Sequence, residues 1–354
     1  MKPDILSLSL EEIRSLVSEL GQPKFRADQL YRWLHISKVA SFKEMTNLPS
    51  KMIAQLEERY IVDPIRLVTY QESAVDGTRK YLFALPDGNL IESVRMIYHH
   101  GISVCISTQV GCRMGCVFCA STLDGLLRNL TVGEMLGQVY AIIRHTGERV
   151  SNLVLMGCGE PMDNYDNVVA FVRRISDENG EHISQRNITV STCGLVPKIL
   201  KLKDENLQIT LAISLHAADD EKRKALMPVA RVYSIAELLT ACRDYYDENK
   251  RRLTFEYGLV RGENDSQAYA EKLGKLLNQY FDHAHVNLIP INPVKERNYN
   301  ATETQAVYAF QKKLEKFQIN ATIRREMGRD IDGACGQLRR RYSEGKPESE
   351  TLEK

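Results

Sequence analysis

The stretch "VCISTQVGCRMGCVFCAS", residues 104–121, holds four of the eight cysteines in the chain. Cys112, Cys116 and Cys119 follow one another at C-x3-C-x2-C spacing, and Cys105 stands seven residues before the first of them. Glycines in this stretch indicate a loop, which argues against three cysteines buried in a core. Three thiols so close together predict a metal centre.

The spacing leaves more than one kind of metal centre open. A structural zinc site takes four ligands, usually as two separated pairs, whereas this loop supplies one compact triplet. His145 or His216 could complete a zinc site. Three cysteines also suit a four-iron cluster whose fourth iron is left open to bind a substrate or a cofactor. On spacing alone, Cys105 is either a spare thiol or a fourth ligand.

The composition indicates a soluble globular protein. The chain has 354 residues, 43% of them hydrophobic and 26% charged, which is ordinary for a globular protein and allows a large domain together with a small one. The first residues do not resemble a signal peptide, and no run approaches the ~20 apolar residues of a membrane span. We therefore expect a cytoplasmic protein with no membrane contact, in which clustered cysteines bind metal or act in catalysis.

Basic residues concentrate in two segments, although the net charge of the chain is only +1. Residues 22–51 hold six Lys or Arg against two acidic residues, a net of +4. Residues 321–342 hold six Arg against three acidic residues, a net of +3. Such patches suit contact with RNA, and they equally suit a solvated basic face.

Residues 1–98 predict a small accessory domain of helices followed by a β-ribbon. Residues 8–58 have helical spacing, with Ser9 as an N-cap and Glu12 as its capping-box partner. Residues 64–97 are short β-rich runs, and the two Asp-Gly pairs that split them are typical of hairpin turns.

Strands and helices alternate from residue 99 onward. The predicted strands span 102–107, 152–156, 187–191, 208–215, 252–260, 285–291 and 320–325. Helical patterns lie between most of them, for example at 132–145, 164–177, 234–249, 266–279 and 302–317. Repeated β–α units imply a parallel sheet with right-handed crossovers. Residues 99–342 therefore predict an α/β fold, a partial (β/α)6 barrel with its active site at the carboxyl ends of the strands, and the polar tail at 343–354 is expected to be disordered.

Polar or glycine-rich motifs follow the predicted strands on what would be one rim of the barrel. They are Gly157-Cys158-Gly159-Glu160-Pro161, Ser191, Ser214-Leu215-His216 and Asn292. Several such motifs on one rim argue for a shared pocket. Each alone has a plainer interpretation, because Ser191 could cap a helix, His216 could be a core histidine, and Asn292 could make a turn before a proline.

The cysteine loop after the first barrel strand resembles the signature of radical S-adenosylmethionine (SAM) enzymes. This resemblance implies a 4Fe–4S cluster held by Cys112, Cys116 and Cys119, whose open iron binds the amine and carboxylate of SAM. Electron transfer from the cluster then cleaves SAM to a 5′-deoxyadenosyl radical. The segment from Gly157 to Pro161 is similar to the motif that meets the SAM amino group, since glycines let the backbone approach a ligand and a carboxylate pairs with an ammonium.

Further motifs narrow the resemblance. The segments "GEPMDNYDNV", "NITVSTCGLVP", "LAISLHA", "VNLIPINP" and "GRDIDGACGQL" are together similar to the RlmN/Cfr family, the radical SAM methyltransferases that act on adenine in RNA. The similarity extends over residues 20–342, nearly the whole chain. Cys158, Cys193 and Gly333 depart from the residues common in the family, and none of them replaces a residue with an assigned role.

The resemblance implies a role for each matching residue. Cys335 is methylated by one SAM, and a second SAM, on the cluster, supplies the radical that takes a hydrogen from that methyl group. The resulting methylene carbon adds to the adenine, and Cys105 then forms a disulfide with Cys335 that frees the product. Glu92 matches the acceptor of the ring proton, with Cys105 as a competing candidate. The SAM contacts carry over to Gly159, Glu160, Ser191, Ser214, Leu215, His216 and Asn292.

The "GEP" and "IPINP" segments look more like the branch that methylates C2 of adenine than the branch that methylates C8. The C2 branch implies 23S rRNA, at the peptidyl-transferase centre, and tRNA, 3′ of the anticodon, as substrates. The family resemblance implies a flavodoxin-type electron donor, and we assume a monomeric enzyme. Adenine C2 is electron-poor and does not attack the SAM methyl group itself, a difficulty that a radical route avoids. The basic patch at 22–51, with Tyr31 and Trp33, is then expected to contact RNA, and the plainer interpretation of both aromatics is that they belong to a helix core. A C8 methyltransferase and a zinc-dependent RNA-binding protein are the alternatives.

Overall fold

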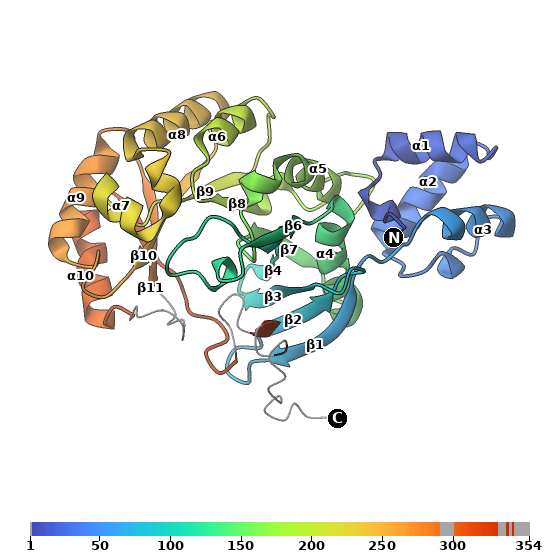
Figure 1. Ribbon diagram of the computed structural model, residues 1–354, viewed down its shortest axis with the longest axis horizontal. Coiled ribbons are helices and arrows are strands. Elements are labelled where there is room, and N and C mark those ends of the chain that lie inside the picture. Colours follow the sequence, from blue (N-terminus) through green and yellow to red (C-terminus); the bar gives the residue numbers. More distant parts are fainter. Residues whose placement is uncertain (1, 291–300, 332–337, 340–341, 343–354) are drawn as a thin grey trace.

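The computed structural model describes residues 2–290, 301–331, 338–339 and 342 (Figure 1). The predicted disordered tail at 343–354 lies outside these residues. Three helices come first, α1 (Leu10–Glu19), α2 (Phe25–Arg32) and α3 (Ser50–Arg59). The predicted capping box of α1 is present, because Ser9 Oγ accepts the Glu12 N–H at 3.1 Å and the Glu12 carboxylate accepts the Ser9 N–H at 2.6 Å.

The predicted β-ribbon is present and continues into the barrel sheet. Its strands β1 (Arg66–Glu72), β2 (Arg79–Ala84) and β3 (Leu90–Tyr98) are antiparallel. Gly77 and Gly88 in its turns have φ values of 70° and 85°, as the Asp-Gly pairs predicted. β3 then pairs antiparallel with β4 (Gly101–Cys105), with Val94 opposite Cys105. The domain boundary predicted at residue 98 thus falls beside the short turn between two paired strands.

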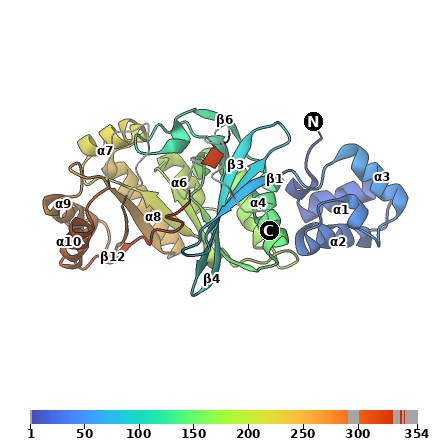
Figure 2. The same ribbon diagram turned by 90° about the horizontal axis from the view of Figure 1, so that it is seen from below.

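Six further strands of the described residues follow β4 in the sheet, all parallel and in chain order. They are β7 (Val150–Leu155), β8 (Ile188–Thr192), β9 (Thr210–Ser214), β10 (Leu253–Leu259), β11 (His285–Pro290) and β12 (Asn320–Ile323). The helices between them are α4 (Val132–Thr146), α5 (Tyr165–Ile175), α6 (Val196–Lys203), α7 (Asp220–Leu226), α8 (Ile235–Asn249), α9 (Gln267–Asn278) and α10 (Thr304–Glu315). Apart from α7, which lies beside the cysteine loop, these helices lie along the outer face of the curved sheet (Figures 1 and 2). The predicted α/β fold is confirmed, with six β–α units in a partial barrel.

A second, two-stranded sheet was not predicted. β5 (Gln109–Gly111) and β6 (Leu126–Asn129) pair antiparallel on either side of the cysteine loop. With three and four residues, these strands are too short to show the alternation of apolar and polar residues on which strand prediction depends. They give the cysteine loop a rigid base.

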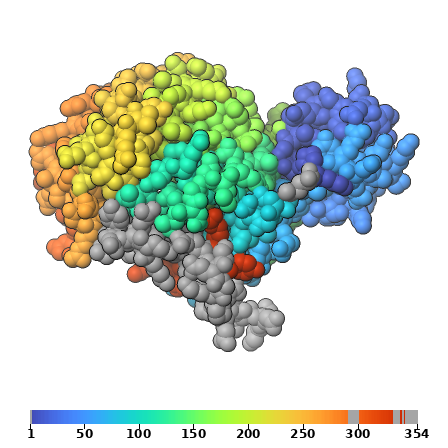
Figure 3. Space-filling model, in the orientation of Figure 1, coloured from blue at the N-terminus to red at the C-terminus, as the bar shows by residue number. Residues whose placement is uncertain are grey.

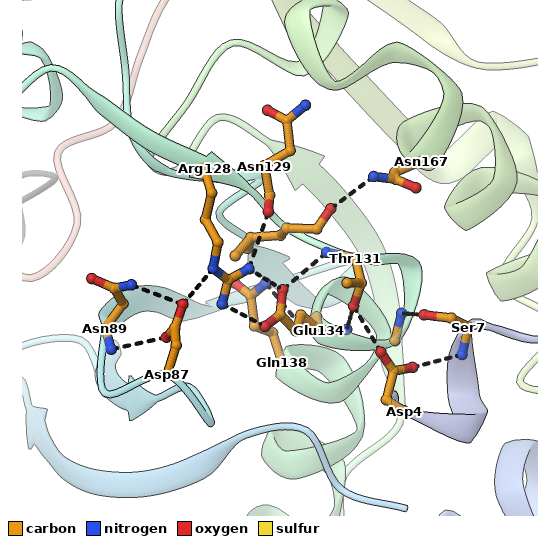
Figure 4. A network of polar contacts seen from close by, with 12 residues as sticks. Asp4, Ser7, Asp87, Asn89, Arg128, Asn129, Thr131, Glu134, Gln138 and Asn167 are labelled. Atoms are coloured by element: carbon orange, nitrogen blue, oxygen red, sulfur yellow. Dashed lines mark hydrogen bonds and ion pairs between the residues drawn. The ribbon is translucent and has the colours of Figure 1, made fainter. Parts of the chain in front are cut away.

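The N-terminal helical unit packs on α4 through buried polar contacts. Asp4 accepts hydrogen bonds from the Ser7 N–H at 2.7 Å and from the Thr131 hydroxyl at 3.0 Å, and the Gly133 N–H donates to Ser7 Oγ at 2.9 Å (Figure 4). Buried apolar side chains of this unit belong to the same core cluster as those of the barrel. The unit is therefore docked on the barrel and does not hang from a linker.

The basic patch at 22–51 contains exposed charged residues and two aromatic residues that are buried or half-buried. Lys24 and Arg32 are exposed. Tyr31 is buried, and its hydroxyl donates to Asp177 at 2.7 Å, so it is a core residue that cannot stack on a base. Trp33 is half-buried and donates from Nε1 to Asn47 at 2.6 Å. The contact with RNA expected here thus rests on the charges and not on Tyr31.

None of the helices in the described part of the chain combines the length and the apolar composition needed to cross a bilayer.

Gly133→Ala should loosen the docking of the helical unit, because a Cβ at this position would overlap the Asp4 carboxylate. Overpacking of this kind costs about 1–3 kcal/mol of unfolding free energy. Gly137→Ala, one turn later on α4, is the matched control, since its Cβ would meet Ile65 at 3.3 Å, where a small shift suffices. Thermal unfolding and limited proteolysis measure the difference, and equal stability of the two variants would contradict the role given to the Asp4 contact.

Candidate functional site

A cavity of about 620 Å³ lies at the carboxyl ends of the parallel strands. The residues that line it include nine predicted site residues: Cys105, Cys112, Cys116, Cys119, Gly159, Glu160, Ser191, Ser214 and His216. Leu215 is fully buried and is not among the lining residues. Asn292 and Cys335 lie outside the described residues. Residues far apart in the sequence meet here because parallel strands bring their carboxyl ends to one edge.

Backbone hydrogen bonds hold the three clustered cysteines. The Thr122 hydroxyl donates to the carbonyl oxygens of Cys116 at 3.1 Å and Cys119 at 2.9 Å. The Cys112 N–H donates to the Gly125 carbonyl oxygen at 2.8 Å. These bonds fix the backbone on either side of the cysteines, and the side chains of all three line the cavity.

Arg128 on β6 attaches the base of this loop to two other elements. Its guanidinium donates to both carboxylate oxygens of Glu134 at 2.8 Å, and its Nε donates to Asp87 at 2.5 Å (Figure 4). Burial raises the pKa of Asp87, but the bonds from Arg128 and Asn89 outweigh it, and the pKa lies at about 2. Asp87 is therefore charged at neutral pH. A bidentate pair of this kind fixes geometry as well as charge, so the loop base, the β2–β3 turn and α4 keep one arrangement.

Cys112 and Cys116 are buried, and their thiols hold their protons when no metal is bound, whereas Cys119 is partly exposed. Burial raises the pKa of Cys112 to about 12, and it raises the pKa of Cys116 as well. The thiolate is the form that binds metal. Binding of a metal group at this loop must therefore release protons.

A buried arginine indicates that an anionic group belongs beside the loop. Arg223 on α7 is fully buried, and it donates to the carbonyl oxygens of Cys193 at 2.7 Å and Leu215 at 3.2 Å. Its Nη1 finds no hydrogen-bond partner among the described residues. A buried cation is costly without a counter-charge. Cys116 packs in one apolar cluster with Leu226 of α7, and an iron–sulfur cluster on three thiolates is anionic, so the residues present fit such a group.

The zinc alternative finds less support in the placement of the side chains. Among the residues that the structure describes, no three His, Cys, Asp or Glu side chains are placed to hold one metal ion. His145 packs against Tyr70 and Tyr81, and His216 Nδ1 accepts the Gly258 N–H at 2.7 Å. Each thiolate of a 4Fe–4S cluster binds its own iron, so three cysteines that line one cavity need not converge on a single point.

Glu160 places a buried carboxylate at the edge of the cavity. Its Oε1 accepts the Met162 N–H at 3.0 Å and its Oε2 accepts the Cys193 N–H at 2.8 Å. Burial raises its pKa, and these bonds oppose that rise. Gly159 before it has a φ of 111°, and a Cβ there would press on Gln109. Each carboxylate oxygen can accept a second hydrogen bond, so Glu160 keeps the capacity to bind the ammonium group of a ligand such as SAM.

Glu256 is a cavity residue that the sequence analysis missed. It stands opposite Ser214 across the pair of β9 and β10, is 4% exposed, and accepts a hydrogen bond from Asn287 Nδ2 at 2.8 Å. Burial raises its pKa. The signal that could have found it is a single acid within "LTFEYGL", a strand buried at every position. A buried carboxylate in a cavity is a candidate for ligand binding.

Glu92 lies in the ribbon beside the cavity, not in its lining. It forms an ion pair with Lys80 at 3.1 Å, in which both side chains are buried. Its Oε1 also accepts the Arg339 N–H at 2.6 Å. Glu92 precedes Val94 by two positions and so shares its face of β3, and Val94 lines the cavity opposite Cys105. Glu92, the predicted proton acceptor, therefore lies close to Cys105, the predicted resolving cysteine. It also contacts Arg339, which follows Cys335 by four positions.

Comparisons with known proteins agree with this geometry. Residues 106–273 match the model of the radical SAM superfamily, and residues 3–62 match the model of the ribosomal RNA large subunit methyltransferase N-terminal domain.

Two relatives carry the description probable dual-specificity RNA methyltransferase RlmN. The protein from Lachnospira eligens is 57% identical over 350 residues, which cover 98% of this chain and 99% of the relative. The protein from Lachnoclostridium phytofermentans is 54% identical, with 97% and 96% covered. A crystal structure of a radical SAM methyltransferase from Sphaerobacter thermophilus is 42% identical and superposes with a TM-score of 0.90 over 95% of this chain and 98% of that one.

Gly111→Ala should reduce the iron content of anaerobically reconstituted protein severalfold. Gly111 has a φ of 77°, and a Cβ there would overlap the Gly125 carbonyl oxygen, which accepts the Cys112 N–H. Gly125→Ala is the matched control, because Gly125 also has a positive φ, 69°, but open space for a Cβ. Iron and zinc per chain are measured for both variants. Full iron loading of Gly111→Ala, or one zinc and no iron in the parent protein, would contradict this account of the loop.

Proposed function

Because the chain belongs to the RlmN family of radical SAM RNA methyltransferases, we propose that it methylates C2 of adenosine in 23S rRNA, at the peptidyl-transferase centre, and in tRNA, 3′ of the anticodon. The observation that carries this proposal is the single cavity shared by Cys105, the cysteine triplet and the SAM-motif residues, with Glu92 beside it. We place the enzyme in the cytoplasm as a monomer that takes electrons from a flavodoxin-type donor.

We divide the predicted site residues into two binding sets. Cys112, Cys116 and Cys119 would hold the 4Fe–4S cluster. Gly159, Glu160, Ser191, Ser214, Leu215, His216 and Asn292 would hold SAM, with Leu215 restricted to backbone contacts because its side chain is fully buried. When bound, the cluster supplies the electron that opens SAM to a 5′-deoxyadenosyl radical. Two SAM molecules are consumed in each turnover.

The chain's own thiols carry the methyl group and release the product. Adenine C2 is electron-poor, so the methyl carbon must reach it from a carrier that can be activated as a radical. Cys335 is this carrier, and for a time its sulfur and the methyl carbon join the protein to RNA. The Cys105 thiolate then attacks the Cys335 sulfur, and the bond between that sulfur and the carbon breaks. The carbon keeps the electron pair and takes up a proton to become the methyl group, and a dithiol reductant must reopen the disulfide before the next turnover.

Glu92 is the acceptor for the proton that leaves C2, and its position supports this role. Its carboxylate is buried and paired with Lys80. Separating Glu92 from Lys80 would leave a buried charge without compensation, which is costly. The Glu92 carboxylate is therefore held beside Lys80. Cys105, opposite Val94 on the neighbouring strand, is the competing acceptor.

Mass spectrometry of nucleosides tests the proposed reaction. RNA incubated with reconstituted protein, SAM and a low-potential reductant should contain 2-methyladenosine, and a Cys112→Ala protein should make none because its cluster is incomplete. 8-Methyladenosine would place the chain in the other branch of the RlmN/Cfr family. No methylated adenosine from protein with full iron loading would overturn the proposal.

Cys105→Ala should trap the protein on RNA. The adduct through Cys335 would form, but no sulfur would be present to displace it. Denaturing gels should show a covalent protein–RNA species, and peptide mapping should place the link at Cys335. The Cys105→Ala/Cys335→Ala protein is the control and should form no adduct. Normal turnover by Cys105→Ala would show that Cys105 has another role.

A further inference from the structure

The turn between β1 and β2 binds the segment that precedes Cys335. The Ser73 hydroxyl donates to Asp330 Oδ1 at 2.5 Å, and the Ala74 N–H donates to Asp330 Oδ2 at 2.8 Å. Both carboxylate oxygens of Asp330 are thus occupied by a turn that lies more than 250 positions earlier in the sequence. Ser73 is buried, and Asp330 is exposed.

A second bond joins the same two segments. The Gly328 N–H donates to Asp76 Oδ2 at 2.9 Å. Burial raises the pKa of Asp76, but the hydrogen bonds from Gly328 and Thr78 outweigh it, and the pKa lies at about 2. The Ser73 and Ala74 bonds lower the pKa of Asp330. Both carboxylates are therefore charged at neutral pH, and bonds to a charged acceptor are stronger than bonds between neutral groups.

The chain after Cys335 is also held, by different partners. The Arg339 N–H donates to Glu92 Oε1 at 2.6 Å, and the Arg339 guanidinium donates to Asp124 at 2.8 Å. Leu338 is buried. Asp124 belongs to the cysteine loop and Glu92 to the ribbon. Figures 1 and 3 show the red C-terminal segment against the blue ribbon.

We propose that Ser73, Asp76 and Asp330 form a clasp that positions the carrier cysteine, Cys335, for its successive partners. This inference rests on the proposed function, in which the Cys335 sulfur must meet a methyl donor, an adenine and Cys105. Holding a reacting group near its partners raises its effective concentration. The clasp thus gives Asp330 a role in the reaction. It also gives one to the turn at Asp76-Gly77, which otherwise only reverses the direction of the chain.

Because Asp330 is exposed, its effect on the position of Cys335 can be measured apart from its effect on the stability of the fold. The Ser73 bond is part-buried and the Ala74 bond is exposed. Contacts of an exposed charged side chain add little to the free energy of unfolding, so removing the Asp330 carboxylate should leave the fold intact. Asp330→Ala deletes both acceptors, and Ser73→Ala deletes one donor. Asp247→Ala is the matched control, because Asp247 is also an exposed aspartate with two partners, Arg243 on α8 and Lys250 at the C-cap of that helix.

The test measures the chemistry of Cys335 and the folding of the chain side by side. Peptide mass spectrometry follows methylation of Cys335 by SAM without RNA, and thiol alkylation follows disulfide formation with Cys105. We expect both rates to fall about tenfold in Asp330→Ala, the effect of losing hydrogen bonds to a charged group, and less in Ser73→Ala. Because the two residues share one contact, the double variant should lose little more than Asp330→Ala. Iron content, melting temperature and the Asp247→Ala control should stay at parental values.

If Cys335 in Asp330→Ala is methylated and oxidised at wild-type rates, the clasp is overturned. The clasp is also overturned if these rates fall only in variants whose melting temperature falls as well. Hydrogen exchange separates this outcome from a failure of the proposed function, because it needs no turnover. The amides of Ala74 and Gly328 should exchange faster in Asp330→Ala even if the parent protein makes no methyladenosine. Unchanged exchange at both amides would contradict the clasp on its own.

Discussion

The antiparallel pairing of β3 with β4 is the interaction on which the rest of the structure depends. β4 pairs on its other side with β7, the next strand of the barrel. One short strand thus joins a ribbon that carries Glu92 to a barrel that carries the cysteine loop. Because Cys105 ends β4, it stands where the two parts meet, opposite Val94 of the ribbon. A register shift of one residue in this pair would turn Glu92 and Val94 to the other face of the sheet.

Charged contacts around the cavity, buried at Lys80, Glu92 and Arg223 and partly exposed at Arg128, serve arrangement more than stability. Arg128 links Glu134 with Asp87, Lys80 pairs with Glu92, and Arg223 holds the carbonyl groups that follow β8 and β9. Replacing such buried ionic groups by apolar ones is often neutral or stabilising, so their use here fits a site that must keep several loops in register. Arg223 adds a positive charge beneath Cys116, where an anionic cluster would be bound.

The sequence predicted much of this, and the misses have physical causes. The α/β barrel, the capping box at Ser9 and the Asp-Gly turns follow from local patterns, and the structure confirms them. Glu256 and Arg223 were missed because only the fold reveals that these charged side chains are buried. β5 and β6 are too short to show a period. The clasp joins Ser73 to Asp330, and no local rule connects residues so far apart. The roles of Asn292 and Cys335 stay predictions, since both lie outside the described residues.

Electron paramagnetic resonance of the reduced protein, recorded before and after addition of SAM, tests the central claim most directly. Cys112, Cys116 and Cys119 are proposed to bind a 4Fe–4S cluster with one open iron that SAM occupies. We expect a spin-half signal from the reduced cluster whose g values shift when SAM is added, and a smaller shift in Glu160→Gln. A signal that SAM leaves unchanged, or iron-free protein that still methylates RNA, would contradict this claim.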